Sequence, residues 1–251
     1  MRPYETRFQM GAKMTTKNAY ELEFRPSSEE EGGATVPFTR IFGEEDFESD
    51  FRWVDLCIVT PGAEIGVHEH LVDDEIYVIL KGNAIKIVND EEAQVGPGDA
   101  ILLKCGGSHG LRNESDQEVH VLVIDLLAPL EQNQRMLLRN IDDVPMRTKK
   151  SMGGVGQIQV GDIFTGDELG GAWDFVQCVK LPPGSAIGVH QHEGDEECYY
   201  IIDGRGLMTV DGEKFVVGPG VASLCRSGSS HGLVNNSDGE ITILVAQAPV
   251  G

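Results

Sequence analysis

Short apolar segments rich in valine and isoleucine recur along the chain, each about the length of a β-strand. They include residues 76–80, 101–103, 119–127, 198–202 and 241–246. Pro-Gly, Gly-Pro-Gly, Asn-Asp and Asp-Gly turn signals separate them at intervals of about 8–16 residues. This pattern predicts an all-β fold of the sandwich or barrel type.

The second half of the chain repeats the first at an offset of 122 residues. PGAEIGVHEH at 61–70 returns as PGSAIGVHQH at 183–192. Of the 52 aligned positions between 62–113 and 184–235, 25 are identical, so the chain holds two tandem copies of one β domain.

The repeat divides the 251 residues into predicted segments. These are an N-terminal tail or edge strand (1–13), a first barrel (14–129), a linker (130–150) and a second barrel (151–251). In the linker, Leu130, Leu137 and Leu138 stand near helical spacing, which predicts a short connecting helix packed between the barrels.

Charge and cysteine content narrow the class of protein. Twenty Lys and Arg against 41 Asp and Glu give a net charge of −21, which disfavours nucleic-acid and membrane-surface partners. No apolar segment reaches the length of a membrane span, and the N-terminus lacks the apolar region of a signal peptide. Five cysteines without a CxxC pair favour a cytoplasmic protein with reduced thiols, and the ordinary proportion of apolar residues favours a globular one.

Six of the seven histidines are pairwise equivalent under the offset. Each copy carries His-x-His, a glutamate five residues later and a distant third histidine. The two sets are His68, His70, Glu75 and His109, and His190, His192, Glu197 and His231. Residues i and i+2 of a strand share a face, so a hairpin can bring each glutamate beside its two histidines. Three imidazoles and one carboxylate suit Fe, Mn, Co, Ni or Zn and leave coordination positions open, which is typical of a reactive site.

Two motifs in each copy resemble the two signatures of the cupin superfamily. In the first copy they are Gly62-x5-His68-x-His70-x4-Glu75-x6-Gly82 and Gly98-x5-Lys104-x-Gly106-x2-His109-x3-Asn113. The second copy matches equally, from Gly184 to Gly204 and from Gly220 to Asn235. In both copies a basic residue, Lys104 or Arg226, stands where the family usually has proline. The resemblance implies a double-stranded β-helix (jelly-roll) barrel in each half, that is, a bicupin with a divalent transition metal in each barrel.

Other residues are candidates for contact with a substrate. Tyr77 and Tyr199 share the inward parity of the glutamates, and either hydrogen-bond a substrate or pack in the barrel wall. Asp55 and its counterpart Gln177 face the metal in one of the two possible strand parities. Near the barrel mouth, Lys104 and Arg226 either bind a substrate carboxylate or remain solvated.

Two functions from different classes follow from these residues. The first is a metal-dependent enzyme acting on a small oxyanionic or carbonyl-bearing metabolite, with Glu75 or Glu197 as a metal ligand or a general base. By family analogy an oxygenase, dioxygenase-like, comes first and an isomerase or epimerase second. The alternative is a non-catalytic cupin that binds a metal or a small ligand. Retention of all four ligands in both copies favours the enzyme.

The surroundings of the two clusters differ, so we expect the two sites to differ in role. Gly194 precedes Glu197 and Arg226 offers a bidentate grip on a carboxylate, which predicts that the second pocket is the more open. Jelly-roll barrels expose apolar faces. We therefore expect the two halves to pack on each other with pseudo-twofold symmetry, with a further homodimer left open.

Overall fold

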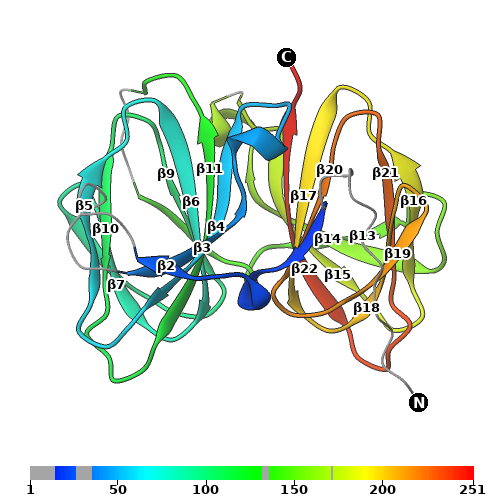
Figure 1. The fold of residues 1–251 in the computed structure, drawn as a ribbon, viewed down its shortest axis with the longest axis horizontal. Coiled ribbons are helices and arrows are strands. Elements are labelled where there is room, and N and C mark those ends of the chain that lie inside the picture. Colours follow the sequence, from blue (N-terminus) through cyan, green and yellow to red (C-terminus); the bar gives the residue numbers. More distant parts are fainter. Residues whose placement is uncertain (1–14, 27–35, 132–135, 171) are drawn as a thin grey trace.

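The computed structural model describes residues 15–26, 36–131, 136–170 and 172–251, and in them it shows two β-barrels side by side (Figure 1). Each barrel combines a seven-stranded and a four-stranded antiparallel sheet, which confirms the all-β double-barrel prediction. In the described part of the chain, the long connections carry short 3-10 turns at Ala19–Glu21, Glu44–Asp46 and Gly166–Leu169. Within the described ranges no helix is long and apolar enough to span a membrane.

The strands of the first barrel form two sheets. The larger has the order β12 (Leu137–Asn140), β9 (Asp99–Leu103), β6 (Asp73–Lys81), β11 (Val119–Leu127), β4 (Phe51–Val59), β3 (Pro37–Phe42) and β2 (Arg25–Pro26). The smaller has the order β5 (Glu64–Glu69), β10 (Ser108–Arg112), β7 (Ala84–Val88) and β8 (Glu91–Val95).

The second barrel repeats this arrangement. Its larger sheet has the order β1 (Thr16–Asn18), β20 (Val221–Cys225), β17 (Asp195–Asp203), β22 (Ile241–Pro249), β15 (Phe175–Leu181), β14 (Gln157–Thr165) and β13 (Met146–Lys150). Its smaller sheet has the order β16 (Ala186–Gln191), β21 (Ser230–Val234), β18 (Gly206–Val210) and β19 (Glu213–Val217).

The larger sheets of the two barrels face each other and bury a shared core (Figure 1). Strand β11 shows why its sequence is apolar at nearly every position. Val121 and Val123 belong to the core inside the barrel, whereas Leu122, Ile124 and Leu126 belong to the core between the barrels. A strand buried on both faces reads as a continuous apolar run.

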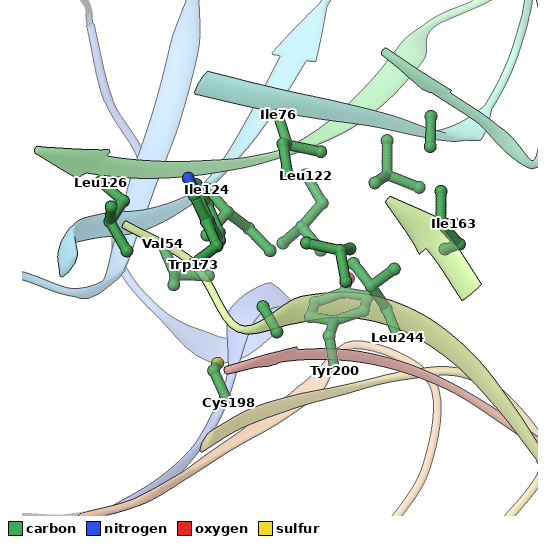
Figure 2. Close-up of a cluster of buried hydrophobic side chains, with 14 of the residues drawn as sticks. Val54, Ile76, Leu122, Ile124, Leu126, Ile163, Trp173, Cys198, Tyr200 and Leu244 are labelled. Carbon is green, nitrogen blue, oxygen red and sulfur yellow. The ribbon is translucent and has the colours of Figure 1, made fainter. Parts of the chain in front are cut away.

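Figure 2 shows side chains from both halves meeting in this inter-barrel core. Ile76 and Leu122 of the first barrel lie opposite Tyr200 and Leu244 of the second, and Trp173 packs edge-on against Phe51 at 5.4 Å between ring centroids. A buried carboxylate adds polar contacts, since Glu196 accepts hydrogen bonds of 2.9 Å from the backbone N–H groups of Glu48 and Ser49.

The strand that precedes each barrel pairs with the other barrel. Strand β1 aligns Thr16 with Ser223 on β20, and β12 aligns Leu138 with Ile101 on β9. These two pairings are equivalent under the 122-residue offset. The exchange places residues 16–18, expected in the first barrel, in the sheet of the second.

Each exchanged strand also carries a basic residue. This residue reaches back from the sheet that the strand has joined and contacts the barrel that follows the strand in the sequence. Lys17 donates to the Ile41 carbonyl at 2.7 Å and pairs with Asp46 at 3.3 Å. Arg139 donates to the equivalent carbonyl of Ile163 and pairs with Glu168. Matching contacts on both sides make the packing pseudo-twofold, as expected from the repeat.

The predicted helix in the linker is wrong. Leu137–Asn140 and Met146–Lys150 are strands, and residues 132–135 lie outside the described residues, as does the N-terminal segment 1–13. Leu137 and Leu138 point to opposite faces, one half-buried and one exposed, because a strand alternates its side chains. The backbone of 137–140 satisfies its hydrogen bonds along β9, which outweighs the helical spacing of the leucines.

We predict that the shared core makes the two barrels unfold as one unit. Leu122→Ala removes a fully buried side chain from this core and should lower the free energy of unfolding by about 2–5 kcal/mol in a single transition. Val216→Ala, at a side chain that is 82 % exposed, should change it by less than about 0.5 kcal/mol. Chemical denaturation followed by circular dichroism measures both. Two separate transitions in the unaltered protein would contradict the shared core.

Candidate metal centres

The first barrel brings its four predicted ligands together. His68 on β5 aligns with His109 on β10, Glu75 begins the inward face of β6, and His70 follows the end of β5. The Glu75 carboxylate lies 2.8 Å from His109 Nε2 and 3.6 Å from His70 Nε2. One ligand atom from each of the four residues lies within 4.8 Å of the others.

The second barrel builds the same cluster from equivalent strands. His190 on β16 aligns with His231 on β21, and Glu197 lies on β17. The Glu197 carboxylate lies 2.9 Å from His231 Nε2 and 3.4 Å from His192 Nε2. Here too the four ligand atoms fall within 4.8 Å of one another.

Hydrogen bonds at Nδ1 fix the orientation of the His-x-His rings. Nδ1 of His68 lies 2.9 Å from the Gly66 carbonyl, and Nδ1 of His190 lies 3.0 Å from the Gly188 carbonyl. His70 and His192 are held in the same way by the carboxylates of Asp73 and Asp195. A ring that donates from Nδ1 presents the Nε2 lone pair to a metal, so these contacts preset the ligands.

The donor set fits a divalent transition metal. His70 Nε2, His109 Nε2 and Oε2 atoms of Glu75 and Glu197 are buried without a hydrogen-bond partner in the described part of the chain. Burying polar atoms in this way costs free energy unless a partner fills the space between them. Imidazole and carboxylate together suit Mn, Fe, Co, Ni or Zn, so each cluster can hold such an ion.

The two glutamates have different electrostatic surroundings. Burial raises the pKa of Glu75, the carboxylates of Asp73 and Asp55 add to the rise, and His70 and Lys86 oppose it. For Glu197 burial also acts upward on the pKa, but the imidazoles of His192 and His231 that face its carboxylate outweigh it and lower the pKa to about 2. A difference in sequence contributes to this contrast, because the second barrel has Gln177 where the first has the acidic Asp55.

A cavity of about 440 Å³ opens onto the first cluster. Its polar lining includes His68, His70, Glu75, Asp55 and Arg40, and its apolar lining includes Phe38, Trp53, Leu71, Val72 and Val123. Leu71 and Val72 are 63 % and 55 % exposed, so the opening is apolar. Arg226, on which the expectation of a more open second pocket partly rested, points instead to the inter-barrel contact, where it donates to the Asp46 carbonyl at 2.6 Å.

The tyrosines lie beside the third histidine of each cluster. The Tyr77 ring is 4.7 Å from the His109 ring and the Tyr199 ring is 4.6 Å from the His231 ring. Both are buried, and burial raises the pKa of both phenols well above the ordinary value. They stay neutral and form part of the barrel wall behind the ligands, and Tyr77 also lines the cavity.

The structure places the remaining substrate candidates differently from one another. Asp55 lines the cavity and accepts two hydrogen bonds from Arg40, at 3.0 and 2.9 Å. Gln177 donates to Asp162 at 2.7 Å. Lys104 is buried against Asp74 at 2.7 Å and, like Arg226, is not brought to the cavity wall. The proline position of the family motif is thus used for ion pairs at the barrel end.

Sequence reasoning missed a buried lysine. Lys86 lies on β7 with its Nζ 2.8 Å from His109 Nδ1 and 3.6 Å from the centre of the Tyr77 ring. Burial lowers its pKa to about 7, with Glu75 acting in the opposite direction. The available signal was a lysine at an inward position of the apolar segment AIKIV, where the second copy has Met208.

Sequence reasoning also missed the arginine pairs around the first site. Arg52 binds Asp73 and lies 3.7 Å from Asp125, while His70 lies 3.9 Å from the same Asp125 carboxylate. His70, Asp73 and Asp125 form a third group with metal-ligand spacing. Because Asp73 is bound by Arg52 and itself contacts Nδ1 of His70, we assign this group to support of His70.

Two jelly-roll barrels, each with three histidines and a glutamate converging inside it, define a bicupin with two candidate metal centres. The family model for the cupin domain matches residues 55–125 and 177–246, more than half of the chain. The chain therefore belongs to the cupin domain family.

Known proteins resemble the chain in sequence or in fold. An oxalate-binding protein of Thermotoga maritima is 28 % identical over 115 residues, which cover 46 % of this chain and 95 % of that protein. The putative glyoxylate-induced protein of Pseudomonas aeruginosa shares the fold with a TM-score of 0.73 at 13 % identity, covering 86 % of this chain and 80 % of that one. Bacillus subtilis oxalate decarboxylase, described with Mn(II) centres, aligns with a TM-score of 0.65 at 16 % identity, covering 97 % and 79 %.

We predict that the purified protein binds up to two divalent transition-metal ions per chain. The paired change His68→Ala/His70→Ala should remove one ion, and His190→Ala/His192→Ala the other, because each pair supplies half of one ligand set. Elemental mass spectrometry after metal-supplemented expression measures the ratio. Less than a tenth of an equivalent in the unaltered protein would overturn the assignment.

Proposed function

We propose that the protein is a metal-dependent enzyme that converts a small oxyanionic or carbonyl-bearing metabolite in its first barrel. The observation that carries this proposal is the cluster of His68, His70 and Glu75 in the wall of a cavity that reaches the surface. A divalent ion held by the histidines and Glu75 would supply Lewis acidity toward a substrate oxygen. Of the candidate reaction classes, we rank oxygenase first and isomerase or epimerase second, by analogy within the family.

Glu75 is the candidate proton acceptor. Its carboxylate lines the cavity beside Tyr77 and Asp55, and burial raises its pKa above that of an exposed glutamate. A carboxylate that titrates closer to neutral pH is better matched to proton transfer. In this role Glu75 takes a proton from the substrate, and in its other role it stays with the three histidines as a ligand.

The cavity lining supports a substrate with an apolar part besides its oxyanion. Phe38, Trp53 and Leu71 are among the residues that line the cavity, and the Arg40 guanidinium lies 4.9 Å from the centre of the Trp53 ring. The volume of about 440 Å³ falls within the range of about 300–1,000 Å³ typical of pockets for small organic ligands. Oxalate, which consists of two carboxylates alone, would leave most of it to water. The oxalate-binding relative supports recognition of a carboxylate, and we extend this to larger carboxylic acids.

The alternative is a cupin that binds a small carboxylate without converting it. One observation favours it specifically: the relative from Thermotoga maritima is described as a binding protein, and the alignment covers 46 % of this chain. In either case the first barrel is the site of ligand binding. A cytoplasmic location and a homodimer stay predictions.

Trp53 fluorescence offers a direct test of ligand binding in the first cavity. We predict that metal-loaded protein carrying Trp173→Phe, which leaves Trp53 as its one tryptophan, changes its emission when oxalate or a larger carboxylic acid binds. Trp173 lies in the inter-barrel core, so protein that retains only Trp173 through Trp53→Phe serves as the control. An unchanged Trp53 signal across a panel of small carboxylates would contradict the proposed class of ligand.

Conversion of the ligand is tested by removing one cluster at a time. His68→Ala/His70→Ala should abolish turnover, whereas His190→Ala/His192→Ala should retain most of it, because the cavity opens onto the first cluster. Glu75→Gln should lower kcat by about 100-fold or more while the ligand still binds, since an amide takes up no proton. Equal loss of activity in both histidine pairs would refute the separation of roles. Ligand binding without turnover in any metal-loaded sample would favour the binding protein.

A further inference from the structure

A lysine is buried in the wall of the first barrel, directly behind a metal ligand. Lys86 has no exposed surface. Its Nζ lies 2.8 Å from Nδ1 of His109, and the Tyr77 ring covers it at 3.6 Å. The ammonium is thus one imidazole ring away from the point where the four ligands converge.

The second barrel has Met208 at this position, also fully buried. Nδ1 of the equivalent His231 has no hydrogen-bond partner among the residues that the structure describes. The His–Glu distances of the two clusters are similar, at 2.8 and 3.6 Å in the first and 2.9 and 3.4 Å in the second. Lys86 is therefore a difference between the two sites that lies in direct contact with a ligand ring.

The extra carboxylates of the first barrel do not offset this charge fully, because they have cations of their own. Asp55 is bound by Arg40 through two hydrogen bonds, and Asp73 is bound by Arg52. Asp125 has the same Arg52 at 3.7 Å. Lys86, in contrast, contacts the rings of His109 and Tyr77.

We propose that Lys86 makes the first cluster hold its divalent ion less tightly than the second. A histidine that binds metal through Nε2 carries a proton on Nδ1 and needs an acceptor there. An ammonium is a donor without an acceptor, and it repels a divalent ion in a medium of low dielectric constant. This contact weakens the first site, whereas the uncharged side chain of Met208 imposes no such repulsion on the second.

The proposal goes beyond the proposed function, although it rests on its metal-binding part. It assigns a weakly bound ion, which exchanges readily, to the first barrel, onto whose cluster the cavity opens. It assigns a tightly bound ion to the second barrel, whose Arg226 contacts the first. Because its test counts bound ions, it does not depend on the substrate or on activity.

The test measures Mn²⁺ affinity of the full chain by equilibrium dialysis at one fixed pH. His190→Ala/His192→Ala isolates the first site and His68→Ala/His70→Ala isolates the second. We expect the first site to bind at least about tenfold more weakly. Adding Lys86→Met should tighten the first site by at least about tenfold, and Met208→Lys should weaken the second by a similar factor. Lys81→Met, which removes an exposed lysine from the same barrel, should change neither.

Each outcome is decisive. Equal affinities of the two isolated sites, or a first site left unchanged by Lys86→Met, would overturn the role of Lys86. If Met208→Lys fails to fold by circular dichroism, the Lys86→Met result decides alone, because methionine already occupies the equivalent buried position. No Mn²⁺ at either site of the unaltered protein would instead refute the metal-binding part of the proposed function.

Discussion

Burial of the larger sheet of each barrel on both faces is the constraint on which the rest of the structure depends. A jelly roll needs one face of this sheet for its interior, but β11 and its counterpart β22 are apolar on the second face as well. Packing the two sheets together removes that surface from water. It also fixes the barrels relative to each other, so the metal clusters lie on opposite sides of one shared core.

The repeat made much of this predictable. A gapless offset of 122 residues identified two equivalent β domains, and the His-x-His, Glu and distant His pattern identified eight candidate ligands that the structure gathers into two clusters. These features are local or repeated, and strand parity alone places His68 beside His70. The linker could not be interpreted in the same way, because the conformation of Leu137–Asn140 depends on pairing with β9, which is distant in sequence.

Side-chain partners were the other feature that the sequence did not reveal. Lys104 and Arg226 had the charge expected of substrate-binding residues, but Asp74 and the Asp46 carbonyl bind them at the barrel ends. For Lys86 the sequence indicated no functional role, because a lysine in a strand ordinarily lies at the surface. Its burial depends on Tyr77 from β6 of the larger sheet and His109 from β10 of the smaller sheet. The two metal clusters therefore have the same ligands and differ in the side chains that surround those ligands.

The reciprocal exchange of β1 and β12 bears on how the chain assembles. One repeat by itself would lack the strand that completes its larger sheet, and only a second copy could supply it, at a rate and extent set by protein concentration. Joining the copies in one chain makes the encounter intramolecular, with an effective concentration in the millimolar range for a short connection. Completion of both sheets is then independent of dilution. Completion of the second sheet depends instead on the order of synthesis, because β1 is made well before β20, the strand with which it pairs.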